Sequence, residues 1–376
     1  MTLVKGFKEY AGEEAEKRQK IKGILATTFK KYGFELAETP IIEYEEFVRG
    51  ENEADNVISD IFKLKDKGKR NLALRYEFTF QLKRLMRNRK LPYKRFQIGE
   101  VFRDEPTASN RFRQFTQCDV DIIGSTIRDE AEILALTNEA LKNLGIEPVI
   151  LVNNRKLLNE ILEEQGVKEK DREQALREID KLDKLRESEI KANLKKIGAE
   201  KILGILKKPE SYFKKYRACK EIEELKEFCT YYNIKINFSP SIVRGLSYYN
   251  GNVFEVKTKG VKESIAGGGS YAFNSVQCTG LSFGIERVLL LSKVKTEKKE
   301  TLIVSLGEDK KAIKLAEKLR KKGENTSILY GKPTKALEYA NSYGINKVIF
   351  LGKEEVKKGK YKIRDMESGK ETLEKM

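Results

Sequence analysis

The amino-acid sequence predicts an α+β protein that carries a helical insertion and a separate C-terminal α/β domain. Three observations predict this class: two long strand patterns joined by a polar loop at Lys94–Gly124, a run of Lys- and Glu-rich helices at about 154–233, and alternating strand and helix patterns after residue 298. A chain of 376 residues is long enough for two or three domains, each with its own core. We place the domains at 1–297 and 298–376.

Composition and charge narrow the class of protein. The sequence is 39% hydrophobic and 35% charged, as in a soluble globular protein, and its net charge of +17 favours polyanionic partners, nucleic acid first. Because the N-terminus is charged and no apolar run is long enough to span a bilayer, we expect a cytoplasmic protein with no membrane partner. Four cysteines are scattered without a CxxC pair, which argues against a zinc ribbon and a disulfide framework.

The sequence contains no histidine. This absence excludes a Ser-His-Asp hydrolase, a histidine general base and every histidine-ligated metal site. We therefore expect any catalysis to depend on positioning, on arginine charge and on Mg²⁺ bound through oxygen atoms.

The hairpin at Lys94–Gly124 is the central feature of the larger domain. Side chains of a strand alternate between two faces, so in its second strand Thr116, Cys118 and Val120 share a face that we expect to be mostly core. The opposite face carries Arg111, Arg113, Phe115, Gln117, Asp119 and Asp121, and Arg103 lies just before the loop. Polar strand faces are often merely solvated, but a row of arginines, an aromatic ring, an amide and carboxylates suits a bound nucleotide and a small polar substrate.

The other elements of the larger domain follow from their periodicity. The predicted strand at 34–42 is broken at Thr39-Pro40, so it is either an edge strand or a dimer contact. The helices at 154–233 are either a solvated spacer or a surface that contacts RNA. We predict further helices at 12–31, after Thr79 and at 129–144, and strands at 58–64, 72–75, 148–153 and again from residue 234.

Glycines and arginines mark a candidate ligand site. Gly267, Gly268 and Gly269 fall within a strand pattern, where glycine usually marks a bulge or a place where another group packs against bare backbone. Any single arginine is more often a surface charge, but a converging set would form a triphosphate site, because planar guanidinium groups pair with phosphate oxygens. Four arginines from separate elements are candidates for such a set, namely Arg103, Arg113, Arg244 and Arg287.

The C-terminal 80 residues or so alternate as β-α-β-α-β-β. This order predicts a small α/β domain with a mainly parallel sheet and helices on its faces. The segment has no phosphate-binding glycine loop and no obvious pair of acids, so we expect it to be a binding module.

Several motifs resemble those of class II aminoacyl-tRNA synthetases, and specifically of the histidyl-tRNA synthetase family. ETPIIEYEEF is similar to the dimer-forming motif 1, GEVFRDE with RFRQFTQCDVDIIG to motif 2 and LSFGIERVLLL to motif 3, while LRYEFT, VRGLSYYNGNVFEV and AGGGSY are similar to the histidine-specific signatures. The resemblance covers essentially the whole chain. It implies a class II synthetase-type antiparallel sheet flanked by helices, a homodimer, and a C-terminal α/β domain that binds the anticodon.

The resemblance also implies roles for individual residues. Arg103 would hold the α-phosphate of ATP, Arg244 would sit against that phosphate and the attacking carboxylate, and Mg²⁺ would accompany the nucleotide without a protein ligand that the sequence identifies. The other residues implied to bind ATP are Glu105, Arg113, Phe115 and Arg287. Those implied to bind L-histidine are Glu77, Thr79 and Gln117 for its ammonium and carboxylate groups, and Asp121, Tyr248 and Tyr249 for its imidazole ring.

The function implied by the resemblance is histidine–tRNA ligation. The enzyme would activate histidine with ATP to histidyl-adenylate and pyrophosphate, then transfer histidine to the 3′ end of tRNA(His). Two alternatives are a non-catalytic paralogue acting as regulatory subunit of ATP phosphoribosyltransferase and an RNA-binding sensor. Retention of Arg244 and of the C-terminal domain argues against the regulatory subunit, whereas Ser247 and Ser270 depart from the family pattern.

Overall fold

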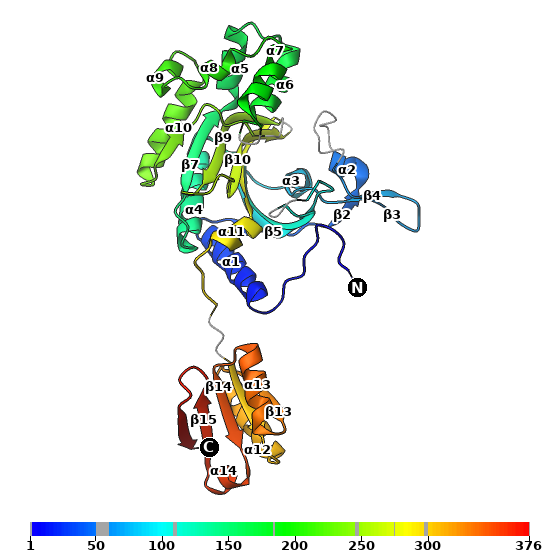
Figure 1. Cartoon of the computed structure of the whole chain (residues 1–376). Coiled ribbons are helices and arrows are strands. Elements are labelled where there is room, and N and C mark those ends of the chain that lie inside the picture. Colours follow the sequence, from blue (N-terminus) through cyan, green and yellow to red (C-terminus); the bar gives the residue numbers. More distant parts are fainter. Residues whose placement is uncertain are drawn as a thin grey trace. The chain divides into compact units, whose positions relative to one another are not determined.

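The computed structural model describes residues 2–49, 60–107, 111–182, 185–244, 248–273, 275–296 and 300–375. The chain divides into two compact units, Met1–Val294 and Lys295–Met376. The predicted boundary between residues 297 and 298 lies outside the described residues. The predicted α+β class is confirmed, because a large mainly antiparallel sheet with helices forms the first unit and a small α/β fold forms the second (Figure 1).

The first unit is built on an eight-stranded sheet in the order β1-β5-β6-β11-β10-β9-β7-β8. All neighbours pair antiparallel except at the two edges, where β1 runs parallel to β5 and β8 runs parallel to β7. The predicted hairpin is the pair β5–β6. The strands are β1 Glu35–Leu36, β5 Tyr93–Phe102, β6 Gln114–Ile123, β7 Val149–Asn154, β8 Ile236–Phe238, β9 Tyr249–Lys257, β10 Ala266–Phe273 and β11 Val276–Gly284.

Helices cover one face of this sheet and form the main core. The helices are α1 Gly12–Lys31, α4 Ile127–Asn143 and α11 Ile285–Leu291, which lie together beside the sheet (Figure 1). Ile21, Leu25 and Phe29 of α1 are fully buried in the same cluster as Cys118 and Val120 of β6. The predicted core face of the hairpin is therefore confirmed, and it turns the opposite face of β6 away from these helices.

A second, three-stranded sheet in the order β2-β4-β3 lies beside the first. The break predicted at Thr39-Pro40 is confirmed, because β1 and β2 belong to different sheets. Of the strand predicted at 58–64, residues 58 and 59 lie outside the described residues, and the described strand starts later, at Lys63. The elements are β2 Ile42–Tyr44, α2 Glu45–Arg49, β3 Lys63–Lys65, β4 Asn71–Leu74 and α3 Thr79–Leu85.

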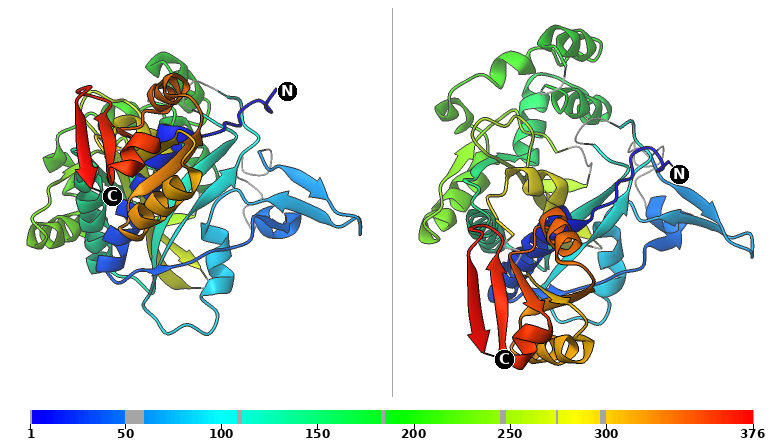
Figure 2. Two further views of the ribbon diagram at one scale, coloured as in Figure 1. Left: turned by 90° about the horizontal axis from the view of Figure 1, so that it is seen from below. Right: turned by 60° about the horizontal axis from the view of Figure 1, so that its bottom comes forward.

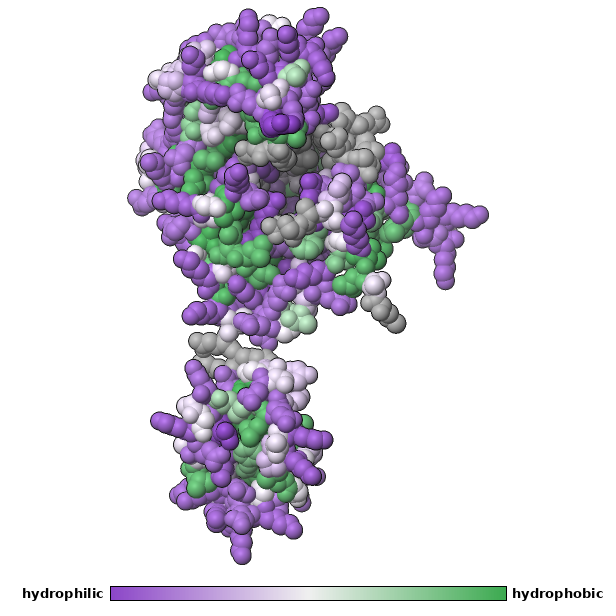
Figure 3. Space-filling view, viewed as in Figure 1, coloured by the Kyte–Doolittle hydropathy of each residue, from purple (hydrophilic) through white to green (hydrophobic). Residues whose placement is uncertain are grey.

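The insertion consists of six helices among the described residues. Its last helix, α10, packs back on α4 and β7, and its apolar side chains join the main core cluster. The insertion is therefore continuous with the sheet rather than an independent spacer, and its outward surface is mostly hydrophilic (Figure 3). The helices are α5 Arg155–Glu164, α6 Glu169–Ile179, α7 Glu187–Lys195, α8 Ile202–Ile205, α9 Glu210–Phe213 and α10 Cys219–Tyr231.

The second unit is a five-stranded sheet in the order β13-β12-β14-β15-β16 with helices on both faces (Figure 2). The sheet is mixed rather than mainly parallel as predicted, because β13, β12 and β14 pair parallel whereas β15 and β16 pair antiparallel. Prediction missed α14 because it is a single short turn of helix, and β16 because all its residues are exposed and polar side chains dominate it. The elements are β12 Glu300–Ser305, α12 Asp309–Lys321, β13 Asn325–Tyr330, α13 Pro333–Tyr343, β14 Lys347–Leu351, α14 Lys353–Lys357, β15 Lys360–Asp365 and β16 Glu371–Lys375.

None of the helices in the described ranges combines the length and apolar character that a membrane span requires.

Candidate active site

A cavity of about 820 Å³ opens on the polar face of β6. Its walls come from β6, β10 and β11, from the segment before α3, and from the ends of β9 and α11. Segments far apart in the sequence therefore meet here. The cavity is lined by the predicted site residues Glu77, Thr79, Arg103, Glu105, Phe115, Gln117, Asp121, Arg244, Tyr248, Tyr249 and Arg287.

Arg113 is the predicted site residue that does not line this cavity. Its guanidinium group lies 3.1 Å from Asp104 and donates a hydrogen bond to the backbone oxygen of Glu105, 3.2 Å away. The carboxylate of Glu105 in turn forms an ion pair with Arg111. Charged groups at the base of the β5–β6 loop thus pair with one another. In this arrangement the guanidinium of Arg113 contacts Asp104 and the backbone of Glu105 and does not line the cavity.

Three of the acidic residues that line the cavity, Glu77, Asp119 and Asp121, are buried. Burial, and after it the neighbouring charge of Asp119, raise the pKa of Glu77 to about 8. Burial also raises the pKa of Asp119, to about 6, and that of Asp121, while the guanidinium of Arg95 opposes both shifts. Glu77 Oε1 accepts no hydrogen bond from any described residue. A buried carboxyl group with a free oxygen is suited to binding an ammonium group.

Asp119, which the sequence left open as a solvated or supporting residue, is only 4% exposed. Both of its carboxylate oxygens accept hydrogen bonds from Gln117 Nε2, at 3.0 and 2.9 Å. Gln117 Oε1 accepts from Arg103, 3.3 Å away. Asp119 therefore fixes the orientation of the Gln117 amide. Arg111 is the other residue of the polar face that received no role in the sequence analysis, and its side chain is 58% exposed.

Arg103 is held by aromatic rings on two sides. Its guanidinium carbon lies 4.4 Å from the ring centre of Tyr76 and 5.0 Å from that of Phe115. Its Nε donates to the backbone oxygen of Tyr76, 3.4 Å away. Cation–π contacts of this kind orient an arginine and leave its remaining N–H groups free for an anion.

Arg244 reaches the cavity because Gly267 has no side chain. A Cβ atom at Gly267 would lie 2.5 Å from the guanidinium carbon of Arg244. Arg244 Nε is buried and makes no hydrogen bond to a described residue. Gly268 has a different reason to be glycine, because a Cβ there would lie 1.9 Å from the backbone oxygen of Gly280. The prediction that these glycines mark close packing on bare backbone is confirmed.

Arg287 lies in α11 and donates to the backbone oxygen of Ser264, 2.5 Å away. Burial lowers the pKa of Arg287; Glu263 opposes this effect, and the positive charges of Arg111 and Arg244 add to it. Positive charges that destabilise one another at a cavity wall create a site for a polyanion.

Arg287 is positioned by a network behind the cavity. The neighbouring Glu286 accepts hydrogen bonds from Arg18 of α1 and from the backbone N–H of Thr116 in β6, both at 3.0 Å. The side chains of the Arg18–Glu286 pair are 8% and 11% exposed. This network ties α11 to α1 and β6, and so fixes the helix that carries Arg287.

An aromatic cluster forms part of the cavity wall. The rings of Tyr248 and Tyr249 lie 4.8 Å apart, and that of Tyr271 lies 5.4 Å from Tyr248. The hydroxyl of Tyr271 donates to Asp121 Oδ1. Tyr249 and Asp121 thus lie at the same end of the cavity, with one hydroxyl and one carboxylate available to a ring that bears two nitrogens.

Two residues of this site were missed from the sequence, Tyr271 and Arg95. Tyr271 follows the glycine triplet directly, which was a usable signal. Arg95 is fully buried in β5 directly opposite Asp121, behind the cavity wall. The feature of the sequence that could have identified Arg95 is a charged residue within a strand whose other side chains are mostly buried. Of the departures from the family pattern, Ser247 lies outside the described residues, and Ser270 is buried and donates to Glu130.

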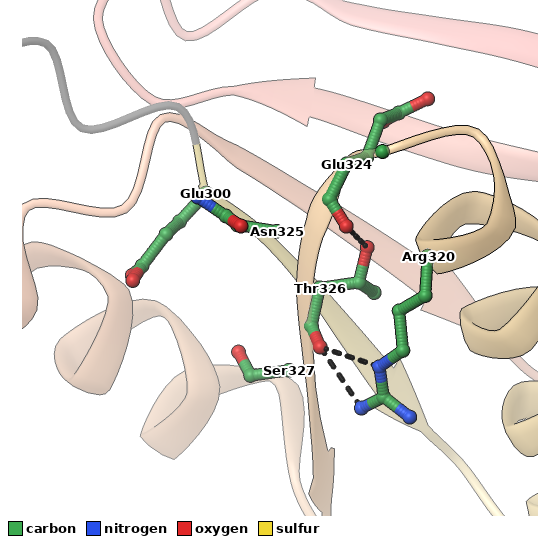
Figure 4. A pocket seen from close by; sticks show the side chains of 7 residues that line it. Glu300, Arg320, Glu324, Asn325, Thr326 and Ser327 are labelled. Carbon is green, nitrogen blue, oxygen red and sulfur yellow. Dashed lines mark hydrogen bonds between the residues drawn. The ribbon is translucent and has the colours of Figure 1, made fainter.

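The second unit has a shallower hollow of about 640 Å³ next to β12 and β13 (Figure 4). Its arginine, Arg320, is already bound, because Nε and NH2 donate to the backbone oxygen of Thr326 at 3.1 and 2.9 Å. This hollow is lined by one arginine with Glu300 and Glu324, whereas three predicted site arginines line the first cavity, so we assign the chemistry to the first unit. Within the described ranges, no cluster of three or more acidic or cysteine side chains could hold a metal ion.

Comparisons with known proteins agree with this geometry. The family model for histidyl-tRNA synthetase matches residues 6–288, and the model for an anticodon binding domain matches residues 300–376. The chain is 33% identical to histidine–tRNA ligase 1 of Bacillus cereus over 99% of this chain and 96% of that protein. It is 32% identical to a histidine–tRNA ligase of Methanococcus aeolicus over 98% of this chain and 97% of that protein.

Solved structures show the same fold. A histidyl-tRNA synthetase from a Nostoc species superposes with a TM-score of 0.85 at 22% identity, covering 100% of this chain and 96% of that one. A protein described as an ATP phosphoribosyltransferase regulatory subunit/histidyl-tRNA synthetase from Bacillus halodurans superposes with a TM-score of 0.81 at 21% identity, covering 93% and 98%. Together with the family model and the curated relatives, which span nearly the whole chain, these matches show that the chain belongs to the histidyl-tRNA synthetase family.

Proposed function

We propose that the chain is a histidine–tRNA ligase, an aminoacyl-tRNA synthetase that activates L-histidine with ATP and transfers it to tRNA(His). One observation carries the proposal: Arg103, Arg244 and Arg287 line the same cavity as Glu77 and Asp121. Three arginines suit the phosphates of ATP, and the buried acids suit the ammonium group and ring of histidine. The curated relatives named histidine–tRNA ligase support the same activity over the whole chain.

The residue roles that we propose are those that the family resemblance implies. Arg103 holds the α-phosphate, Arg287 the outer phosphates, and Arg244 the α-phosphate together with the attacking carboxylate of histidine. Phe115 stacks on the adenine and Glu105 helps to place it, while Arg113 joins the outer phosphates after leaving Asp104. Since the substrate carboxylate attacks phosphorus directly, no protein nucleophile is required. The fixed positive charges stabilise the charge that develops during transfer.

The amino acid is bound at the other end of the cavity. Glu77 and Thr79 hold the ammonium group, and Gln117 holds the ammonium or carboxylate group. Asp121 and Tyr249, with Tyr248 beside them, contact the imidazole. A polar site of this kind rejects apolar amino acids strongly, because they leave its buried groups without hydrogen-bond partners.

Mg²⁺ enters this proposal as part of the ATP substrate. Magnesium keeps several waters and binds phosphate oxygens with one or two carboxylates, so it needs no complete protein site. Glu255 lines the cavity and would be available as such a carboxylate. It would help to orient the nucleotide by holding its metal.

The assembly and domain assignments are part of the proposal. We propose a cytoplasmic homodimer with a catalytic domain at 1–297 and an anticodon-binding domain at 298–376. Leu36, Ile41, Ile42 and Tyr44 support the dimer, because these large apolar side chains are 44–54% exposed around β1 and β2. The basic net charge supports tRNA as the partner.

The test is histidine-dependent exchange of pyrophosphate into ATP, measured with and without tRNA(His). We expect exchange that requires histidine and Mg²⁺, and transfer of histidine to the tRNA. A folded protein that binds histidine but shows no exchange favours the alternative, a regulatory subunit of ATP phosphoribosyltransferase. Retention of Arg244 and of the second unit speaks against that alternative.

A further inference from the structure

Arg95 is a buried cation that does not line the cavity. It is 0% exposed, lies on β5 directly opposite Asp121 on β6, and its NH2 is 2.9 Å from Asp121 Oδ2. NH2 also donates to the backbone oxygen of Phe78, 3.2 Å away. Nε and NH1 find no hydrogen-bond partner among the described residues. Keeping a desolvated guanidinium in a strand costs stability, so its position calls for a specific reason.

Asp121 is held between Arg95 and the cavity. Its Oδ1 accepts the hydroxyl of Tyr271, while Oδ2 lies beside Arg95 but accepts no hydrogen bond from a described residue. Gly280 lies opposite Asp121 on β11 and leaves space for the carboxylate. The outcome is a carboxylate that lines the cavity and whose orientation is fixed by Arg95 on one oxygen and by Tyr271 on the other.

We propose that Arg95 is a positioning residue that makes the site select the neutral imidazole form of histidine. This inference rests on the proposed function. Beside an isolated buried carboxylate, an imidazolium ion is favoured, because it cancels the buried charge. Arg95 already cancels the charge of Asp121, so a second cation gains little. A neutral ring can still donate its N–H to Asp121 and accept the hydroxyl of Tyr249.

Other titratable groups around Asp121 are consistent with this balance. They are Glu77, Asp119, Tyr249, Tyr271 and Cys278. Burial raises the pKa of each tyrosine and of the cysteine, so these three stay neutral near pH 7. Asp119 is occupied by Gln117, and Glu77 faces the ammonium group in the proposed binding mode. A second cation, Arg244, acts on Tyr249, but in the proposed binding mode it faces the α-phosphate and the carboxylate of histidine. Asp119 is held by a neutral amide, and the charge of Arg95 acts on it as well as on Asp121. Arg95 is therefore the cation paired directly with the carboxylate that faces the imidazole.

The experiment has two parts. In the first, histidine labelled with nitrogen-15 in its ring is bound to the unmodified protein at pH 6, where much of the free ring is protonated. We expect nitrogen chemical shifts of a neutral ring in the complex. Shifts of an imidazolium ion in the complex overturn the role of Arg95 and leave the proposed ligase intact. Absence of histidine binding instead contradicts the proposed function.

In the second part, the KM for histidine in pyrophosphate exchange is compared between Arg95→Met and the unmodified protein at pH 6 and pH 8. Loss of the cation requires one more proton in the complex, which changes the KM ratio by up to tenfold per pH unit. We expect the ratio at pH 8 to exceed that at pH 6 by at least about tenfold. Arg95→Lys keeps the charge, and its ratio should not vary with pH.

A ratio for Arg95→Met that is equal at both pH values means that Arg95 is merely structural and overturns the proposal. A pH-dependent ratio in Arg95→Lys also overturns it. Should Arg95→Met fail to fold, the double variant Arg95→Met/Asp121→Asn removes both charges together and serves in its place. This neutral pair should give a ratio that does not vary with pH, and a pH-dependent ratio contradicts the charge argument.

Discussion

Replacing Gly280 by alanine tests whether Asp121 is positioned by the sheet. A Cβ at position 280 would lie 2.1 Å from Asp121 Oδ1 and 3.1 Å from the backbone oxygen of Val120. The carboxylate must therefore retreat by about 1.3 Å to reach ordinary van der Waals contact at 3.4 Å. That movement breaks the hydrogen bond from Tyr271, and a hydrogen bond to a charged group contributes about 1.5–3 kcal/mol.

If Asp121 binds the imidazole, the displaced carboxylate also loses its hydrogen bond from the ring, which is of the same charge-assisted kind. That loss raises the KM for histidine by roughly 10- to 150-fold, since 1.4 kcal/mol corresponds to a factor of ten. The KM for ATP should change little, because the arginines are elsewhere on the cavity wall. Pyrophosphate exchange at varied histidine and varied ATP measures both values. A folded Gly280→Ala protein with an unchanged KM for histidine refutes the role of Asp121.

Gly23→Ala is the matched control for this substitution. Gly23 lies in the interior of α1, and a Cβ there meets no atom within 4 Å. The same chemical change should therefore stabilise the protein by about 0.5–1 kcal/mol and leave both KM values unchanged. Thermal unfolding of the two variants separates the effect of local packing from the general effect of replacing glycine.

Three further predictions follow from the site and its support. Arg244→Ala should lower pyrophosphate exchange by about 10²- to 10³-fold with histidine binding largely intact, and loss of histidine binding in calorimetry would contradict the assigned role. Burial raises the pKa of Glu77 from 4.5 to about 8, so the free energy of unfolding should fall as pH rises from 4.5 to 8. Glu77→Gln should therefore flatten the dependence of Tm on pH, and Tm curves that run parallel for the two proteins would refute this. Glu286→Ala leaves Arg18 without its buried partner and should lower the free energy of unfolding in urea by about 3–5 kcal/mol. Glu14→Ala, at the exposed pair with Lys8, should lower it by less than about 1 kcal/mol. Equal losses in the two variants would contradict the network.

Local patterns were sufficient for most of the elements. The apolar spacing of Ile21, Leu25 and Phe29 predicted α1 with its observed bounds, 12–31. Alternation along β6 placed Gln117, Asp119 and Asp121 on one face, where they line the cavity. These successes share a physical cause, because the periods of helix and strand are properties of the backbone alone.

Other parts of the structure could not be predicted, because they depend on tertiary contacts with residues far apart in the sequence. Arg113 shares the polar face with Gln117, yet it pairs with Asp104 outside the cavity. The helices at 154–233 have the composition of a solvated surface, but α10 packs on the sheet. A long charged side chain can turn to the nearest opposite charge, and a half-apolar helix packs wherever an apolar surface is available. Neither choice is encoded in a local period.

The sequence by itself determined which side chains could form the site: the face of β6, the bare backbone at Gly267, and arginines on separate elements. The tertiary structure alone decided that Arg244 passes over Gly267 and that Arg95 lies opposite Asp121. The reason is that the face of a strand is set by its own backbone, whereas strand order and register are set by contacts between residues far apart in the chain. The charge of the site depends on those distant contacts.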